Sequence, residues 1–209
     1  VQVEIIESPD GITVPLERFA AAINESTALV ATSQVYFTSG AIQDIGGLAD
    51  LAHSRGARLL IDGYQGAGQV PTDVAATNLD FYCAGGLKWL LGGSGIAFLY
   101  VHPALVSQLE PRVTGWFGHA APFKFDPMVL ERAADAHRFD VGTPSVASVY
   151  AQLGGLSVLQ EIGHREVQAA TRELTEDLIA LADARGLRPK VHADPARRSA
   201  IVMLPRRDP

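Results

Sequence analysis

Short apolar runs alternate with amphipathic stretches along the first part of the chain. The runs at 1–7, 27–35 and 57–62 have the length and the apolar, often β-branched composition of strands. The stretches at 15–23 and 44–56 have the apolar spacing of helices. Strands that alternate with helices in this order predict βαβ units and a mostly parallel, doubly wound α/β sheet.

Two further strand-like runs, at 79–85 and 95–101, lie on either side of a glycine-rich loop. The loop is too short for a helical crossover, so we expect these two strands to pair antiparallel. In the helix expected over 44–56, Asp44 is placed to cap the first turn and Gly56 to end the last one.

The pattern changes in the second half. Residues 102–142 are irregular and rich in aromatic side chains, whereas helical spacing returns over 144–163 and 164–186. A last strand-like run follows at 199–205. The chain begins in one strand-like run and stops just after another, so we expect it to be an internal piece of a longer protein.

The amino-acid composition argues against several classes of function. The 209 residues carry a net charge of −6 with no basic run, which argues against a nucleic-acid partner. No apolar stretch reaches the about 18–20 residues of a membrane span, so no membrane partner is expected either. The single cysteine, Cys83, excludes an internal disulfide and a cysteine-rich metal site, and it fits a reducing, cytoplasmic location. No metal is expected.

Two glycine-rich stretches suggest nucleotide or hydrolase chemistry but lack a required part. GAGQVP (66–71) follows a strand, but Pro71 replaces the third glycine of a dinucleotide loop and no helix pattern begins there. A nicotinamide enzyme would need glycine at that position. GGSGI (92–96) lacks the last glycine of a hydrolase nucleophile elbow.

Lys88 is the strongest candidate for chemistry. It is one of three lysines, and the seventeen residues YCAGGLKWLLGGSGIAF (82–98) contain no other charge. The alternative is a lysine whose stem packs on the protein while its head reaches water. A buried lysine has a lowered pKa, and its neutral amine can form a Schiff base with a carbonyl compound or with pyridoxal phosphate.

Pyridoxal phosphate also requires a carboxylate beside its ring nitrogen, because the protonated ring is the electron sink. Asp62 stands at the carboxyl end of a predicted strand, the edge at which ligands bind in such sheets. It is therefore the candidate partner of Lys88.

Two stretches, LLIDGYQGAGQVP (59–71) and LDFYCAGGLKWLLGGSGIAFLYV (79–101), resemble the fold-type I pyridoxal-phosphate enzymes of the class V aminotransferase group. That group includes cysteine desulfurases, kynureninases and isopenicillin-N epimerase-like proteins. The resemblance implies that Asp62 pairs with the pyridinium nitrogen, Gln65 lies by the ring hydroxyl, and Lys88 forms the Schiff base.

The resemblance continues into the second half of the chain. GWFGH (115–119) resembles a kynureninase stretch whose tryptophan reaches the cofactor phosphate, which suggests Trp116. FDVGTPSV (139–146) resembles a segment that carries a phosphate contact across a dimer interface, which suggests Thr143. A helix N-cap is the structural alternative for Thr143. The resemblance therefore implies a homodimer with a shared active site and a small amino-acid substrate.

Two residues depart from the kynureninase pattern. Kynureninases have histidine where Gln65 stands, and tyrosine where Leu87 stands; cysteine desulfurases have histidine before the lysine. The expected activity is hydrolysis of the Cβ–Cγ bond of a kynurenine-like substrate, or transamination. A cysteine desulfurase-like or epimerase-like enzyme, or a non-catalytic homologue, remains the alternative.

The resemblance also implies a fold and a division of the chain. We expect an aspartate-aminotransferase-like, seven-stranded-type sheet with helices on both faces, followed by the start of a smaller α/β domain. Residues 1–143 would form part of the cofactor-binding large domain, 144–186 a helical connection, and 187–209 the truncated start of the small C-terminal domain.

Overall fold

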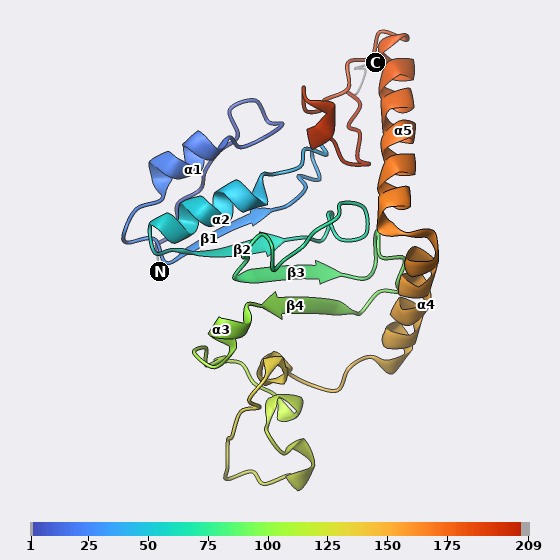
Figure 1. Cartoon of the computed structure of the whole chain (residues 1–209). Helices are drawn as coiled ribbons and strands as arrows, with labels where there is room; N and C mark the ends of the chain where they lie inside the picture. The colour runs from blue at the N-terminus through green and yellow to red at the C-terminus, as the bar shows by residue number, and fades with distance from the viewer. Residues whose placement is uncertain (1, 206–209) are drawn as a thin grey trace.

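The computed structural model describes residues 2–205 of the chain (Figure 1). Its sheet has the strand order β1-β2-β3-β4. The strands are β1 (Leu29–Ser33), β2 (Arg58–Asp62), β3 (Phe81–Gly85) and β4 (Ala97–Val101). β1, β2 and β3 are parallel, and β4 pairs antiparallel with β3. The expected α/β class and the expected antiparallel pair are confirmed.

The helices follow the predicted order. The α-helices are α1 (Leu16–Ala22), α2 (Ile45–Ser54), α3 (Pro103–Val106), α4 (Val146–Ile162) and α5 (His164–Asp183). Short 3-10 helices are η1 (Trp116–Gly118), η2 (Pro122–Lys124), η3 (Ala136–Phe139) and η4 (Pro195–Arg197). Asp44 caps α2 as expected, because its Oδ1 accepts a hydrogen bond from the Gly47 amide at 2.9 Å. Gly56 follows the helix with φ of +75°, a conformation that favours glycine.

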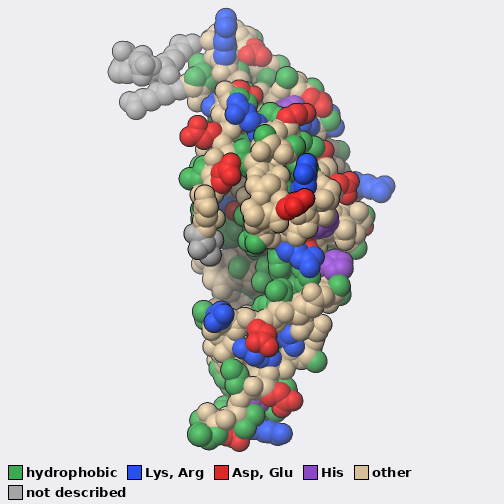
Figure 2. All heavy atoms as spheres, turned by 90° about the vertical axis from the view of Figure 1, so that its left-hand side faces the viewer, with side chains coloured by type: hydrophobic (Ala, Val, Ile, Leu, Met, Phe, Trp, Pro, Cys, Tyr) green, Lys and Arg blue, Asp and Glu red, His purple; other side chains and the backbone are tan. Residues whose placement is uncertain are grey.

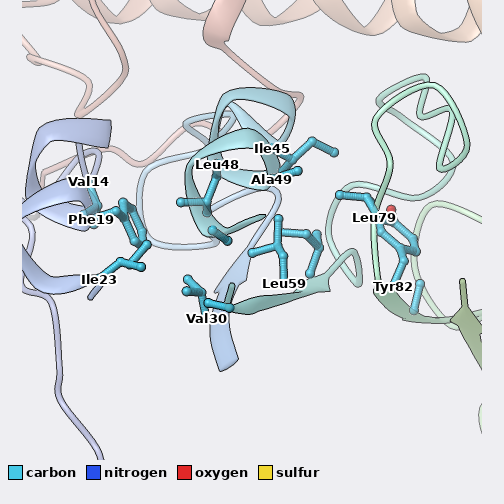
Figure 3. Packing of buried hydrophobic residues seen from close by; sticks show 14 residues of the cluster. Val14, Phe19, Ile23, Val30, Ile45, Leu48, Ala49, Leu59, Leu79 and Tyr82 are labelled. Atoms are coloured by element: carbon cyan, nitrogen blue, oxygen red, sulfur yellow. The ribbon is translucent and has the colours of Figure 1, made fainter. Parts of the chain in front are cut away.

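One face of the sheet carries the core. Helix α2 packs over β2, and α1 packs beside α2 (Figures 1 and 3). Period-2 alternation turns Leu59 and Ile61 of β2 toward α2, where both are fully buried. The buried cluster continues through α1, α2 and β3, and its labelled members in Figure 3 are Val14, Phe19, Ile23, Val30, Ile45, Leu48, Ala49, Leu59, Leu79 and Tyr82.

The opposite face of the sheet carries exposed apolar side chains. Leu29 of β1 pairs in register with Arg58, and Leu99 of β4 pairs with Cys83. Because paired residues share a face, Leu29 and Leu99 point away from α2, and both are exposed.

Helices α4 and α5 rise beside the end of the sheet at which β3 finishes (Figure 1). Two side chains of α4 bind the glycine-rich loop: the Ser148 hydroxyl donates to the Ser94 carbonyl at 2.7 Å, and Gln152 Nε2 donates to the Leu90 carbonyl at 3.1 Å. Helix α4, which is not part of the sheet, therefore fixes the position of the segment after Lys88 through these two hydrogen bonds. The division of the chain at residues 143 and 186 stays a prediction.

Two expected strands are wrong. Residues 2–7 form no strand, and Val1 lies outside the described residues. The side chains of Val3 and Ile5 are 78% and 83% exposed, so residues 2–7 do not pack against the sheet through these two positions. In the run 199–205, Met203 makes an isolated antiparallel bridge with Lys190, which is too little for a ladder. Residues 206–209 of the expected small domain lie outside the described residues.

The surface carries charged side chains of both signs. On the face seen in Figure 2, acidic and basic side chains are interspersed. Within residues 2–205, every helix is too short or too polar to cross a membrane.

Candidate functional site

A cavity of about 340 Å³ opens beyond the carboxyl ends of β1 and β2. This is the edge at which parallel α/β sheets bind ligands. Its lining residues are Ser33, Val35, Phe37, Asp62, Tyr64, Gln65 and Lys88. Asp62, Gln65 and Lys88, which are separated by up to 26 positions in the sequence, therefore line the same cavity, as the sequence predicts.

Asp62 is the last residue of β2 and pairs in register with Ser33 at the end of β1. Its backbone carbonyl accepts a hydrogen bond from the Gln34 amide at 2.8 Å, so the strand end is held on both sides. Its Oδ1 accepts a second bond from the Tyr64 amide at 2.8 Å, which orients the carboxylate. A carboxylate can end this buried strand because the side chain leaves the core and enters the cavity.

The turn after Asp62 contains two glycines, Gly63 and Gly66, whose backbone lies in close contact with the buried side chains of Tyr82 and Gln34. A Cβ on Gly63 would lie 1.9 Å from the Tyr82 ring, and one on Gly66 would lie 2.0 Å from Gln34 Oε1. The Tyr82 hydroxyl donates to Gln34 Oε1 at 2.7 Å, and Gln34 Nε2 donates to the Thr72 hydroxyl at 2.7 Å. Burial raises the pKa of Tyr82 to about 12, so the hydroxyl stays a donor at neutral pH. The hydrogen bonds among Tyr82, Gln34 and Thr72 therefore support the backbone of this turn.

Gln65 is held through its side chain and its backbone. Trp89 Nε1 donates to Gln65 Oε1 at 3.1 Å, and the Gln69 side chain donates to the Gln65 carbonyl. The two segments meet at Gly68, where a Cβ would lie 2.4 Å from the Trp89 carbonyl oxygen. The turn after β2 is thus in close backbone contact with the segment that carries Lys88.

Lys88 follows the end of β3 by three residues, and its carbonyl accepts a bond from the Leu91 amide at 3.1 Å. Its Nζ lies 4.9 Å from the centre of the Tyr64 ring, within cation–π distance. Gly85 makes room for that ring, since a Cβ there would lie 2.3 Å from it. Lys88 is exposed in this chain although it lines the cavity, so of the two alternatives left open by the sequence the lysine whose head reaches water is the one found.

Cys83 shares the cavity-side face of the sheet with Asp62, its register partner. Burial raises the pKa of the Cys83 thiol, and the negative charge of Asp62 raises it further. The thiol therefore stays protonated at neutral pH. It behaves as a small packing residue rather than as a nucleophile.

Trp116 and Thr143 lie outside the lining of the cavity in the described chain. Trp116 begins η1 and stacks on Phe125, with ring centres 5.6 Å apart. Thr143 is exposed in the segment before α4, whose N-cap is Ser145, so the capping alternative for Thr143 is wrong. The two expected phosphate contacts are not brought to Asp62 and Lys88 within one chain.

Sequence reasoning missed Tyr64 and Trp89. Tyr64 contributes its amide to Asp62 and its ring to Lys88, and Trp89 binds Gln65. The available signal was that Tyr64 precedes Gln65 and Trp89 follows Lys88, but adjacency in sequence does not say which side chains point into a cavity.

The donor set of the cavity fits pyridoxal phosphate. Lys88 offers a primary amine to an aldehyde, Asp62 a carboxylate to a ring nitrogen, and Gln65 an amide to a ring oxygen. Among residues 2–205, no group of three or more histidine, cysteine or acidic side chains could hold a metal ion.

Comparisons with known proteins agree with this donor set. A family model described as aminotransferase class V matches residues 1–205. The chain is 36% identical to the uncharacterized aminotransferase YcbU of Bacillus subtilis (strain 168), over 88% of this chain and 48% of that protein. It is 31% identical to a kynureninase of Geobacillus thermodenitrificans (strain NG80-2), over 85% of this chain and 42% of that protein.

A solved structure shows the same fold. An apo cysteine desulfurase from Thermococcus onnurineus NA1 superposes with a TM-score of 0.85 at 22% identity, covering 97% of this chain and 50% of that one. The chain thus spans about half the length of the proteins that it matches. The matching family model and these relatives lead to one conclusion: the chain belongs to the class V aminotransferase family of fold-type I pyridoxal-phosphate enzymes.

Proposed function

We propose that Lys88 bonds the aldehyde of pyridoxal phosphate and that the protein uses this cofactor to convert a small amino acid. The observation that supports the proposal is the shared cavity, in which one amine, one carboxylate and one amide meet at the carboxyl ends of parallel strands. Pyridoxal phosphate supplies the electron sink when it is bound. The protein residues supply its attachment, its orientation and the movement of protons.

Each residue has a separate task. Asp62, oriented by the Tyr64 amide, holds the proton on the ring nitrogen. Lys88, when its amine is free, would take or return a proton at the substrate carbon. Gln65 donates to the ring oxygen. The ring of Tyr64 lies under the lysine head and limits where the amine can move.

The reaction proposed first is kynureninase-like hydrolysis of a Cβ–Cγ bond, or transamination. A kynureninase and an aminotransferase are both among the relatives. Gln65 and Leu87 depart from the kynureninase pattern, so a desulfurase-like or epimerase-like reaction is the alternative. Measurement of alanine release from kynurenine, amino transfer to a keto acid, and sulfide release from cysteine would separate these reactions.

We further propose a homodimer with a shared active site. Trp116 and Thr143 lie outside the cavity of their own chain, which fits a contribution to the cavity of a second copy. The aromatic side chains around Trp116 remain exposed: Phe123 and Phe125 are 70% and 69% exposed. A cytoplasmic location stays a prediction from the single cysteine.

Borohydride reduction tests the proposed function. The protein is incubated with pyridoxal phosphate, reduced, digested and mapped by mass spectrometry. We expect the cofactor on Lys88, and Lys88→Ala should lose both the linkage and the visible absorption band. A retained linkage in Lys88→Ala would refute the assignment of Lys88.

Asp62→Asn is the second arm of this test. The variant should keep the linkage at Lys88 but lose at least about a hundredfold in turnover, because an amide does not hold the ring nitrogen protonated. Near-normal turnover would refute the role of Asp62. A cofactor linkage with no turnover of any amino acid in the unaltered protein would instead indicate a non-catalytic homologue.

A further inference from the structure

The amide of Gln65 has two chemically opposite ends, and one of them is fixed by Trp89. An indole N–H is a donor and never an acceptor, so the atom of Gln65 that faces it must be the carbonyl oxygen. The distance between Trp89 Nε1 and Gln65 Oε1 is 3.1 Å. The Gln65 NH₂ group is therefore the end left for the cavity, and among the described residues it makes no hydrogen bond.

The backbone leaves Trp89 little freedom to move away. The Trp89 carbonyl lies against Gly68, which has φ of +98° and no room for a Cβ. The next carbonyl, that of Leu90, accepts from Gln152 of α4. Gln65 is fixed as well, because its own carbonyl is bound by Gln69. Both partners of the Trp89–Gln65 bond are thus anchored independently of the bond itself.

From this geometry we propose that Trp89 is a positioning residue, which fixes Gln65 as a hydrogen-bond donor toward an anionic ring oxygen of the bound cofactor. The proposal rests on the proposed function for the identity of the cofactor. Without Trp89, the amide could turn and present its oxygen to the anion, which would replace an attraction with a repulsion. The indole acts through Gln65 and needs no contact with the cofactor.

The proposal predicts a spectroscopic effect. The visible band of the lysine-bound cofactor changes with pH, and deprotonation leaves more negative charge on the ring oxygen for a donor to stabilise. Weakening that donor should therefore raise the pH midpoint. Because the donor binds the ring oxygen in both protonation states, only the difference between the two states shifts the midpoint, so the full loss of such a bond sets an upper limit of about one to two pH units. We expect a rise of about half to one unit in Gln65→Ala and a smaller rise, of about 0.3–0.5 unit, in Trp89→Phe.

A double-mutant cycle on the purified holoenzyme tests whether Trp89 acts through Gln65. In the Gln65→Ala background, Trp89→Phe should move the midpoint by less than about 0.2 unit, because no amide is left to orient. Gln65→Glu should raise the midpoint at least as much as Gln65→Ala, since the carboxylate still accepts from Trp89 but cannot donate, and its negative charge repels the ring oxygen. The same shift for Trp89→Phe in both backgrounds, or no shift in either, would overturn the proposal. Melting temperatures identify any variant that has unfolded.

A measurement without cofactor separates this proposal from the proposed function. The chain has two tryptophans, so Trp89→Phe assigns the Trp89 indole N–H signal in a proton–nitrogen NMR spectrum. Gln65→Ala should move that signal toward the position of an indole without a protein partner, and Gln65→Glu should not. An unmoved signal in Gln65→Ala would show that the bond is absent and would overturn the proposal. A cofactor-free purified protein that binds no pyridoxal phosphate would instead refute the proposed function.

Discussion

At the residue scale, the sequence reveals which groups can react but not how they are oriented. Asp62 could be predicted because it ends an apolar run that is recognisable as a strand, and ligands bind at that edge of such sheets. Lys88 could be predicted because it is the only charged residue in a stretch of seventeen. The bond between Trp89 and Gln65 could not be predicted, because it depends on the rotamers of two side chains on different segments. The sequence left burial and exposure of Lys88 open for a related reason: apolar neighbours in sequence need not surround a side chain in space.

Tyr82 offers a prediction about stability at this scale. Tyr82→Phe removes the donor to Gln34 Oε1 and leaves that buried oxygen unpaired, which should lower the free energy of unfolding by about 1–3 kcal/mol. Chemical denaturation at pH 7 measures the loss. The control is Tyr150→Phe, which alters an exposed phenol and should change the value by less than about 0.5 kcal/mol.

The same variant should change how stability depends on pH. The pKa of Tyr82 is about 12 in the folded protein, above the ordinary value of 10.0 that it has when unfolded. Above pH 10 the unfolded chain therefore binds fewer protons than the folded one, and stability falls as the pH rises toward 12. Tyr82→Phe should make this fall shallower. Parallel curves for the two proteins between pH 9 and 11.5 would contradict the explanation.

At the element scale, strand-like sequence became a strand only where a neighbouring strand was available. The runs that became β1, β2 and β3 each pair with another run, and crossovers through α2 and the turn after β2 bring them together. The runs at 2–7 and 199–205 have similar composition but no ladder in residues 2–205. Apolar alternation reports local preference, and pairing is decided by the rest of the molecule.

Gly68 gives a prediction about how two elements meet. Gly68→Ala would place a Cβ 2.4 Å from the Trp89 carbonyl oxygen, in a backbone conformation that L side chains rarely adopt. We expect the free energy of unfolding to fall by about 2 kcal/mol or more. The matched control is Gly154→Ala in α4, where the added Cβ meets nothing within 4 Å; it should raise stability by about 0.5–1 kcal/mol. Equal effects in the two variants would contradict the close approach.

At the scale of the whole molecule, the fold explains the division between the two groups of predicted site residues. Asp62, Gln65 and Lys88 come from segments joined by the parallel strands, so one chain brings them together. Trp116 and Thr143 come from the part of the chain between α3 and α4, much of which lies below β4 in Figure 1, and neither residue lines the cavity. The resemblance could suggest these five residues, but only the structure could show that three of them line one cavity and that Trp116 and Thr143 do not.

The exposed aromatic side chains around Trp116 give the last prediction. Phe123 packs edge-on against Trp116 at 5.7 Å and Phe125 stacks on it at 5.6 Å, yet both phenylalanines remain largely exposed. An aromatic cluster on a surface is typical of a protein interface. We expect the holoenzyme to sediment as a dimer, and Phe123→Ser with Phe125→Ser to shift it toward the monomer with weaker binding of cofactor. Leu174→Ser on α5, which also alters an exposed apolar residue, is the control and should leave the dimer intact. A dimer of unchanged strength in the double variant would place the interface elsewhere, and a monomeric holoenzyme with full activity would exclude a shared active site.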